Sequence, residues 1–262
     1  MDDFILKAVE RVIRAMQNNL GEPITIDDMA RTAMFSKFHF SRMFQRVTGI
    51  SPGRFLSALR LQEAKRLLLA SSLTVADISH LVGYNSIGTF SSRFRMSVGV
   101  SPTAYRQFEG YVPPLADMAS PVRPRRGDGT ELRGQVHQQP PSGDIVVGLF
   151  ADRIAQGMPV RHTTLTSAGE FVLPEVPDGA WYVLAQSVSA GLGEQGARDE
   201  VHVAALGPIT VSDGKPVRRL DLWLRPRQIF DPPTLLAQFD ETMWTARTRA
   251  PGGAEEAALP GA

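Results

Sequence analysis

The spacing of apolar residues divides the chain into two parts with different periodicity. Up to about residue 110 the apolar residues recur every three or four positions, which is typical of helices that bury one face. After residue 130, short segments rich in β-branched and aromatic residues are separated by Gly, Pro, Asp or Ser, which is typical of strands and turns. The expected strands cover residues 144–151, 159–166, 170–176, 180–188, 201–206 and 218–226. The pattern therefore predicts a multidomain protein, with an all-α domain followed by an all-β antiparallel sandwich.

The boundaries between these parts follow from composition. Residues 111–130 are rich in Pro and Gly and have no apolar period, so we interpret them as a linker. The helical domain then covers residues 1–110, and the sandwich covers residues 131–230. Residues 231–262 end in a segment rich in Gly, Ala and Pro. We expect this tail to be largely disordered after at most one short helix at 233–246.

The helical domain contains an internal repeat of about fifty residues. The segment TGISPGRFLS at 48–57 returns as VGVSPTAYRQ at 98–107, and the match extends backwards from both. The matched pairs are Thr25/Thr74, Asp28/Asp77, Phe35/Tyr84, Phe40/Phe90, Phe44/Phe94, Gly49/Gly99, Ser51/Ser101, Pro52/Pro102 and Phe55/Tyr105. A repeat of this length indicates a duplicated supersecondary unit.

Each copy has the local signals of a short helix, a tight turn and a longer helix. A Thr followed three residues later by Asp predicts a capping box at the start of the short helices, 26–33 and 75–82. The longer helices, 36–48 and 86–98, end at a Gly that suits a left-handed backbone conformation. A Ser-Pro pair then starts a further helix in each copy. This order is that of a helix-turn-helix unit, whose second helix can lie in a DNA major groove.

The two copies and the helix between them resemble the DNA-binding domain of the AraC/XylS family of bacterial transcription regulators. The resemblance is carried by SKFHFSRMFQRVTGISPGRFLSALRLQEAKRLL and then TVADISHLVGYNSIGTFSSRFRMSVGVSPTAYRQ, and it covers about residues 5–108. It implies a seven-helix domain that places two recognition helices in successive major grooves of promoter DNA. The common family arrangement has this domain at the C-terminal end beside a cupin-like sensor, so its N-terminal position here is a departure.

The residues expected to contact DNA lie on the helix faces opposite the apolar stripes. In the first recognition helix they are Lys37, Phe38, Ser41, Arg42 and Gln45. Arginine bonds to guanine, glutamine suits adenine, and an aromatic ring can meet the methyl group of thymine. The resemblance also implies base contacts at Phe38, Ser41 and Arg42. The alternative is that these are solvated surface residues, with Phe38 packed on a neighbouring helix.

The second recognition helix offers less for direct readout of bases. Its expected DNA contacts are Ile87, Ser91, Ser92, Arg93 and Arg95, and most of the other side chains on this face are small. We interpret the two arginines as phosphate contacts, which position a domain without reading sequence. The first unit is therefore expected to supply most of the sequence specificity.

The C-terminal part resembles transthyretin-like and carboxypeptidase-regulatory-like sandwich domains. The resemblance rests on segments such as GEFVLPEVPDGAWYVLA, in which a Val-Pro-Asp-Gly turn reverses the chain between two strands. It covers about residues 131–226, and it implies a fold without implying a function.

Charge differs between the two parts of the chain. Residues 1–110 carry 14 Lys and Arg against 9 Asp and Glu, whereas residues 131–262 carry 11 against 16. A polyanion is therefore an expected partner of the first part only. The chain has no cysteine, which excludes disulfides and thiolate metal sites and fits a reducing compartment.

Signals of catalysis, cofactors and membranes are weak throughout. The sequence has no nucleophile elbow, phosphate loop or paired-acid motif, so we do not expect an enzyme. His137, His162 and His202 lie on three different segments of the expected sandwich without a second ligand at metal spacing, so we expect no metal and no other cofactor. No run of about 18 apolar residues is present, and we expect a cytoplasmic, nucleoid-associated protein that does not bind membranes.

These observations predict a sequence-specific transcription regulator whose partner is double-stranded promoter DNA. RNA polymerase is a further expected partner. The sandwich is expected to serve homodimerisation, partner docking or effector sensing. The alternative is a DNA-tethered interaction module, whose sandwich recruits another protein rather than sensing a ligand.

Overall fold

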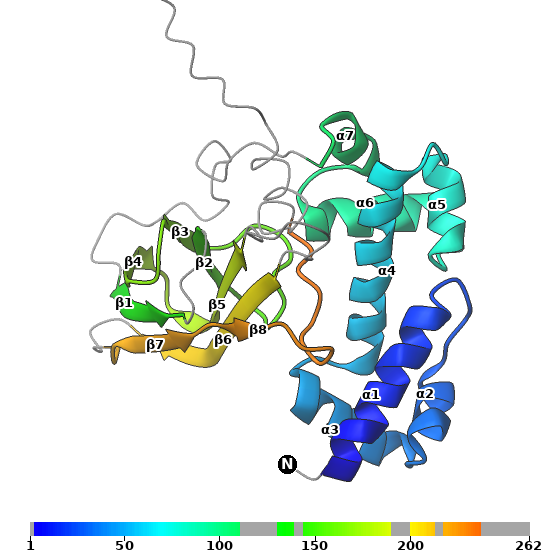
Figure 1. The fold of residues 1–262 in the computed structure, drawn as a ribbon, viewed down its shortest axis with the longest axis horizontal. Coiled ribbons are helices and arrows are strands. Elements are labelled where there is room, and N and C mark those ends of the chain that lie inside the picture. The colour runs from blue at the N-terminus through cyan, green and yellow to red at the C-terminus, as the bar shows by residue number, and fades with distance from the viewer. Residues whose placement is uncertain (1–2, 111–129, 139–143, 190–199, 213–216, 237–262) are drawn as a thin grey trace, which may run out of the picture.

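The computed structural model describes residues 3–110, 130–138, 144–189, 200–212 and 217–236. Seven helices form one side of the molecule and eight strands form the other, within these residues (Figure 1). The helical domain is residues 3–110, and we call residues 130–236 the β region. The expected linker lies outside the described residues except for its last position.

The helices confirm the prediction of an all-α first domain. They are α1 (Asp3–Asn18), α2 (Ile26–Ala33), α3 (Lys37–Thr48), α4 (Pro52–Ala70), α5 (Val75–Leu81), α6 (Ile87–Val98) and α7 (Pro102–Gln107). Helices α2 and α3 form the first repeat unit, and α5 and α6 form the second. The long helix α4 joins the two units.

Both short helices begin with the capping box that the repeat predicts. The Asp28 N–H donates to Thr25 Oγ1 at 3.2 Å, and the Thr25 N–H donates to Asp28 Oδ2 at 3.0 Å. In the second unit the same two bonds join Thr74 and Asp77 at 3.1 and 3.2 Å. Each box gives a side-chain acceptor to two backbone N–H groups at the start of the helix. These two bonds fix the residue at which the helix begins.

The capping boxes make the start of α2 and α5 sensitive to acid. Hydrogen bonds from Thr25 hold the pKa of Asp28 below its ordinary value, and Thr74 lowers the pKa of Asp77 in the same way. Because the pKa of each aspartate is lower in the folded protein, its ionised form stabilises the fold. This stabilisation is complete above the ordinary carboxyl pKa of about 3.9 and is lost as the pH falls through the lowered pKa. We expect helicity, followed by circular dichroism, to fall in this acid range. Asp28→Asn with Asp77→Asn should remove part of that pH dependence, and an unchanged acid transition would contradict the assignment.

Aromatic rings form the core of both repeat units. Phe40 and Phe44 in α3 are fully buried, with ring centroids 5.5 Å apart. Phe90 and Phe94 in α6 repeat this pair at 5.7 Å, and Tyr105 of α7 packs edge-on against Phe94. The apolar stripes predicted from the sequence are therefore the buried faces of the two longer helices.

The strands form two sheets. They are β1 (Thr130–His137), β2 (Ile145–Phe150), β3 (Arg161–Leu165), β4 (Glu170–Val176), β5 (Gly179–Ser189), β6 (Glu200–Val211), β7 (Leu220–Trp223) and β8 (Arg225–Pro226). One sheet has the order β4-β1-β7 and the other has the order β3-β2-β5-β6-β8. Side chains from both sheets share one hydrophobic core, which includes Leu132, Val147, Leu149, Phe171, Leu173 and Val183.

One strand pair corrects the prediction of an entirely antiparallel β domain. Strands β1 and β7 are parallel, with Gly134 opposite Leu220. A Cβ at Gly134 would overlap the carbonyl oxygen of Leu220 and the ring of Phe171, so this close pairing requires glycine. The local sequence pattern does not encode strand direction, because β1 and β7 lie more than eighty residues apart in the chain.

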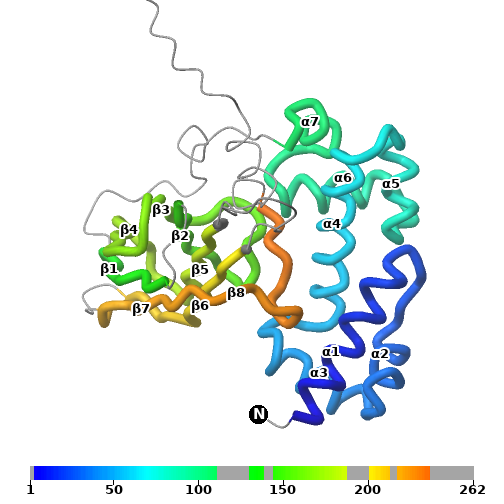
Figure 2. The backbone as a smooth tube through the Cα atoms, viewed as in Figure 1, coloured from blue at the N-terminus to red at the C-terminus, as the bar shows by residue number. Residues whose placement is uncertain are grey.

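Residues 227–236, which we call the docking segment, pack along the helical domain. Figure 2 shows this stretch of the backbone between the sheets and α4. Leu235 and Leu236 are buried, and Leu235 belongs to the same hydrophobic cluster as the core of the helical domain. Residues 231–236 belong to the tail expected from composition, and the rest of that tail, residues 237–262, lies outside the described residues.

A buried lysine holds the docking segment on α4. The ammonium group of Lys65, which is 2% exposed, donates to the carbonyl oxygens of Thr234 and Leu235, both at 3.1 Å. The backbone N–H groups of Leu235 and Leu236 donate to the carbonyl oxygen of Ala155, which follows β2. The segment is therefore bonded to both parts of the protein.

Candidate nucleic-acid interface

Helix α3 presents the side chains that the sequence predicts on the face opposite its buried phenylalanines. Phe38 is 84% exposed, and Arg42 and Gln45 are also exposed, whereas Ser41 is half-buried. The alternative that Phe38 packs on a neighbouring helix does not fit this exposure. Lys37 at the start of α3 forms an ion pair with Asp27, with Nζ and Oδ2 3.1 Å apart.

Helix α3 carries one exposed arginine that the sequence analysis does not name. Arg46 lies four residues after Arg42, one helical turn further along. Neither guanidinium has an ion-pair partner within the described residues. The four-residue spacing from Arg42 is the signal that could have identified it.

Helix α6 presents a different set of side chains. Ile87 is 44% exposed, Ser92, Arg93 and Arg95 are exposed, and Ser91 is half-buried. The first turn of this helix therefore offers a branched apolar side chain, and its arginines lie in the last two turns. Arginine can bond to phosphate oxygens as well as to base edges, and a phosphate contact positions a domain without reading sequence.

The charge of both longer helices has one sign. Neither α3 nor α6 contains an aspartate or glutamate, while α3 carries one lysine and two arginines and α6 carries two arginines. The four arginines have no ion pair within the described residues, and such exposed cations attract a polyanion and displace its counterions on binding.

The helix that separates the two units, α4, is nearly as long as one turn of B-DNA. Helix α4 has 19 residues, which corresponds to about 28 Å at 1.5 Å per residue. One turn of B-DNA is about 34 Å long. The termini of α4 are fixed by Pro52 at its first position and by the turn that leads to α5. Two helix-turn-helix units on one spacer, each with an exposed basic second helix, define a double helix-turn-helix DNA-binding domain.

Comparison with known proteins refines this class. Residues 29–107 match the family model described as a helix-turn-helix domain. The transcriptional activator AarP of Providencia stuartii is 29% identical over 98 residues, which are 37% of this chain and 73% of that protein. The regulator YbfP of Bacillus subtilis is 33% identical over 102 residues, which are 39% of this chain and 35% of YbfP. The part of the chain from α2 to α7 thus matches a helix-turn-helix domain and is similar to bacterial transcription regulators of the helix-turn-helix type.

Solved structures are similar to about 40% of the chain. An AraC-type regulator from Chromobacterium violaceum aligns with 27% identity and a TM-score of 0.39, covering 40% of this chain and 93% of that one. The DNA-binding domain of AdpA, solved with a target DNA, aligns with 29% identity and a TM-score of 0.37, covering 40% and 92%. The matched part spans only about a third of the length of several relatives, including YbfP and the lactose operon activator of Staphylococcus xylosus.

The three histidines of the β region do not converge. The carboxylate of Asp221 accepts a hydrogen bond from His137, with Nε2 and Oδ1 3.0 Å apart, and the His137 ring stacks on Trp223. Burial lowers the pKa of His162. Among the described residues no group of three or more histidines and carboxylates is placed to hold a metal ion. Within the same residues no helix is long and apolar enough to cross a membrane.

Proposed function

We propose that the protein is a sequence-specific transcription regulator that inserts α3 and α6 into successive major grooves of promoter DNA. The observation that carries this proposal is the pair of exposed, acid-free helix faces on two copies of one unit. The AraC-type domain and its regulator relatives support the same role.

The two helices have different tasks in this proposal. Phe38, Arg42 and Gln45 of α3 read base edges, with Ser41 beside them and Lys37 at the helix start. Arg93 and Arg95 of α6 bind phosphates, while Ile87, Ser91 and Ser92 contact the groove without much discrimination between bases. Arg46 adds a phosphate contact at the end of α3. The first unit therefore supplies most of the specificity.

The β region has a regulatory role in this proposal. Two sheets around one core support its interpretation as a transthyretin-like sandwich. Its contacts with the helical domain, through Lys65 and the docking segment, favour regulation of DNA binding over a loose tether. Homodimerisation through this region and contact with RNA polymerase at the promoter are further parts of the proposal, and light scattering of the full chain tests the first of them.

The proposal is tested by mapping the chromosomal sites of the protein and measuring the affinity of the full chain for a recovered site. Because about five cations on α3 and α6 displace counterions, raising the salt concentration from about 50 to 200 mM should weaken binding on the order of 10²–10³-fold. Arg93→Ala and Arg95→Ala should each reduce the salt slope by about one. A salt-independent affinity, or equal affinity for the site and a scrambled duplex, would contradict the proposal.

A further inference from the structure

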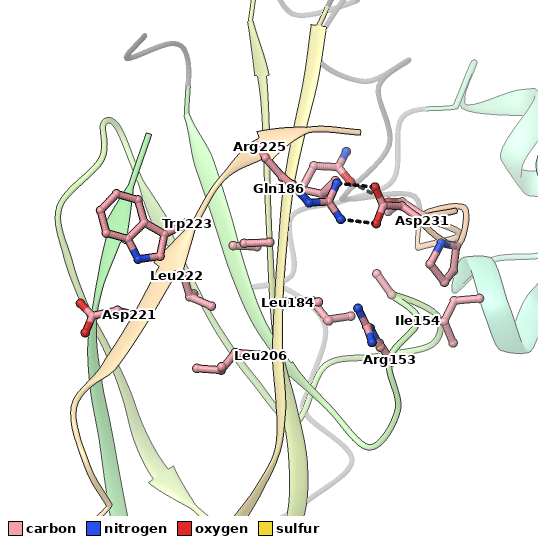
Figure 3. A pocket seen from close by; sticks show the side chains of 17 residues that line it. Arg153, Ile154, Leu184, Gln186, Leu206, Asp221, Leu222, Trp223, Arg225 and Asp231 are labelled. Atoms are coloured by element: carbon pink, nitrogen blue, oxygen red, sulfur yellow. Dashed lines mark hydrogen bonds and ion pairs between the residues drawn. The ribbon is translucent and has the colours of Figure 1, made fainter. Parts of the chain in front are cut away.

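A cavity of about 340 Å³ lies in the β region beside the helical domain. It is bounded by β5, β6, the stretch from β7 to β8, the loop after β2 and the docking segment (Figure 3). Its volume falls at the lower end of the range of small-molecule sites, which is about 300–1,000 Å³. None of the expected DNA contacts lines it.

The walls of the cavity are largely apolar because of strand register. Leu184 pairs with Ala205 across β5 and β6, and Gln186 pairs with Val203, so these four side chains share one face of the sheet. This face is turned toward the docking segment, since Thr234 donates to Gln186 Oε1 at 2.6 Å. The remaining apolar wall consists of Ile154, Ala155, Leu206, Leu222 and Pro232.

Two arginines are the cations of the cavity wall, and they differ in their partners. Arg225 is held by Asp231 through two bonds of 2.7 Å, so its charge is neutralised. Arg153 has no ion pair or side-chain hydrogen bond within the described residues, because the neighbouring Asp152 pairs with Arg54 of α4 instead. Asp221, the other carboxylate of the wall, bonds to His137. Within the described residues the cavity therefore offers one cation without an ion pair, Arg153, beside an apolar surface.

We propose that this cavity binds a small apolar organic acid, with its carboxylate on Arg153 and its hydrocarbon part against Ala155, Leu184 and Ala205. A guanidinium binds a carboxylate through charge-assisted hydrogen bonds, which are stronger between partly buried groups than in water. The apolar wall supplies the rest of the affinity by removing hydrocarbon from water. A neutral or cationic ligand would leave Arg153 without compensation.

The cavity wall also touches the ends of both recognition helices. The Arg153 side chain lies so close to Gly49, at the end of α3, that a Cβ there would overlap it. The Gly157 N–H donates to the carbonyl oxygen of Ser97 in α6 at 2.9 Å, and Leu236 packs near Gly99. A ligand that orders the loop 151–158 and the docking segment therefore alters the contacts that hold the ends of α3 and α6. The effect of the ligand on DNA binding rests on the proposed function.

Calorimetry of the full chain without DNA tests the cavity by itself. The probes are hexanoate, octanoate, benzoate and phenylacetate, each compared with its amide at concentrations up to about 10 mM. The acids are expected to bind about tenfold more tightly than the amides, because only the acids form charge-assisted bonds to Arg153. Equal binding of acids and amides, or no heat from any of the four acids, overturns the proposal.

Two substitutions provide a matched pair. Ala205→Glu places a carboxylate on the cavity face and should abolish binding of the acids, whereas Ala205→Gln has the same size and should retain most of it. Ala205 is exposed, so neither change removes core packing. In Arg153→Met the acids and their amides should bind with about equal affinity. Equal loss of binding in Ala205→Glu and Ala205→Gln would show that the carboxylate does not meet Arg153 and would overturn the assignment.

The coupling is measured separately as the affinity for a mapped site with and without the tightest acid. A change of about fivefold or more is expected, and the ligand affinity should change by the same factor when DNA is present. If the acid binds but DNA affinity is unchanged, the coupling is wrong and the cavity assignment stands. If no DNA binds under any condition, the proposed function fails independently of the cavity.

Discussion

Replacing Arg42 with alanine should weaken binding to a mapped operator by about 10- to 100-fold, since a bidentate arginine contact contributes about 1–3 kcal/mol of discrimination between bases. Arg42 is exposed on α3, has no ion pair within the described residues, and lies one turn from the exposed ring of Phe38. The fold should be unaffected, because the side chain contributes nothing to the buried face formed by Phe40 and Phe44. Footprinting and fluorescence anisotropy on the operator measure the loss.

Two control variants separate base reading from charge. Arg42→Lys keeps the positive charge but loses the planar fork of donors, so it should retain non-specific binding and lose most of the preference for the operator. Arg95→Ala removes a proposed phosphate contact on α6 and should weaken binding to operator and scrambled DNA by similar factors. A footprint of Arg42→Ala that matches the unmodified protein would show that α3 does not read this operator through Arg42.

The helical domain could be predicted from the sequence because its determinants are local. The bonds between Thr25 and Asp28 span three residues, and Phe40 and Phe44 share a face because they lie one turn apart. The left-handed conformations of Gly49 and Gly99 follow from the repeat for the same reason. The exposure of the expected DNA contacts on α3 then follows from the direction of its buried face.

The contacts between the two parts could not be predicted in this way. In the sequence, Lys65 looks like an ordinary charged residue of a long helix. Its hydrogen-bond acceptors, the carbonyl oxygens of Thr234 and Leu235, lie 169 and 170 residues later in the chain. Residues 231–236 have the composition of a tail, and only the hydrophobic surface of the helical domain gives Leu235 a reason to be buried. Arg153 acquires its position against Gly49 from a loop between two strands. Such contacts depend on tertiary structure and leave no periodic signal.

The contacts between the β region and the helical domain, which we call the junction, help to distinguish a regulator from a tethered interaction module. A tether needs only a covalent linker, and it does not require the β region to contact the recognition helices. Here the loop after β2 reaches α6 through Gly157 and Ser97, and Asp152 forms an ion pair with Arg54 at the start of α4. Changes within the β region therefore have a direct physical route to the helices that are proposed to contact DNA, which favours the regulator.

Replacing Lys65 with methionine should open the junction between the two parts of the protein. Methionine preserves the volume of the buried stem but leaves the carbonyl oxygens of Thr234 and Leu235 without the ammonium donor, at about 1–3 kcal/mol for each buried acceptor. Hydrogen exchange at the Leu235 and Leu236 amides, which bond to Ala155, measures the opening directly. We expect their protection to fall by one to several powers of ten, while amides within α4 remain protected.

Lys7→Met is the matched control for this change. Lys7 is exposed, and its ion pair with Asp3 lies on the surface of α1, where such pairs contribute about 0–1 kcal/mol. This variant should leave exchange at Leu235 and Leu236 unchanged. If Lys65→Met also left these amides fully protected, the bonds from Lys65 would not be what holds the docking segment on α4. If both variants lost protection throughout the chain, the effect would be general instability and the role assigned to Lys65 would be wrong.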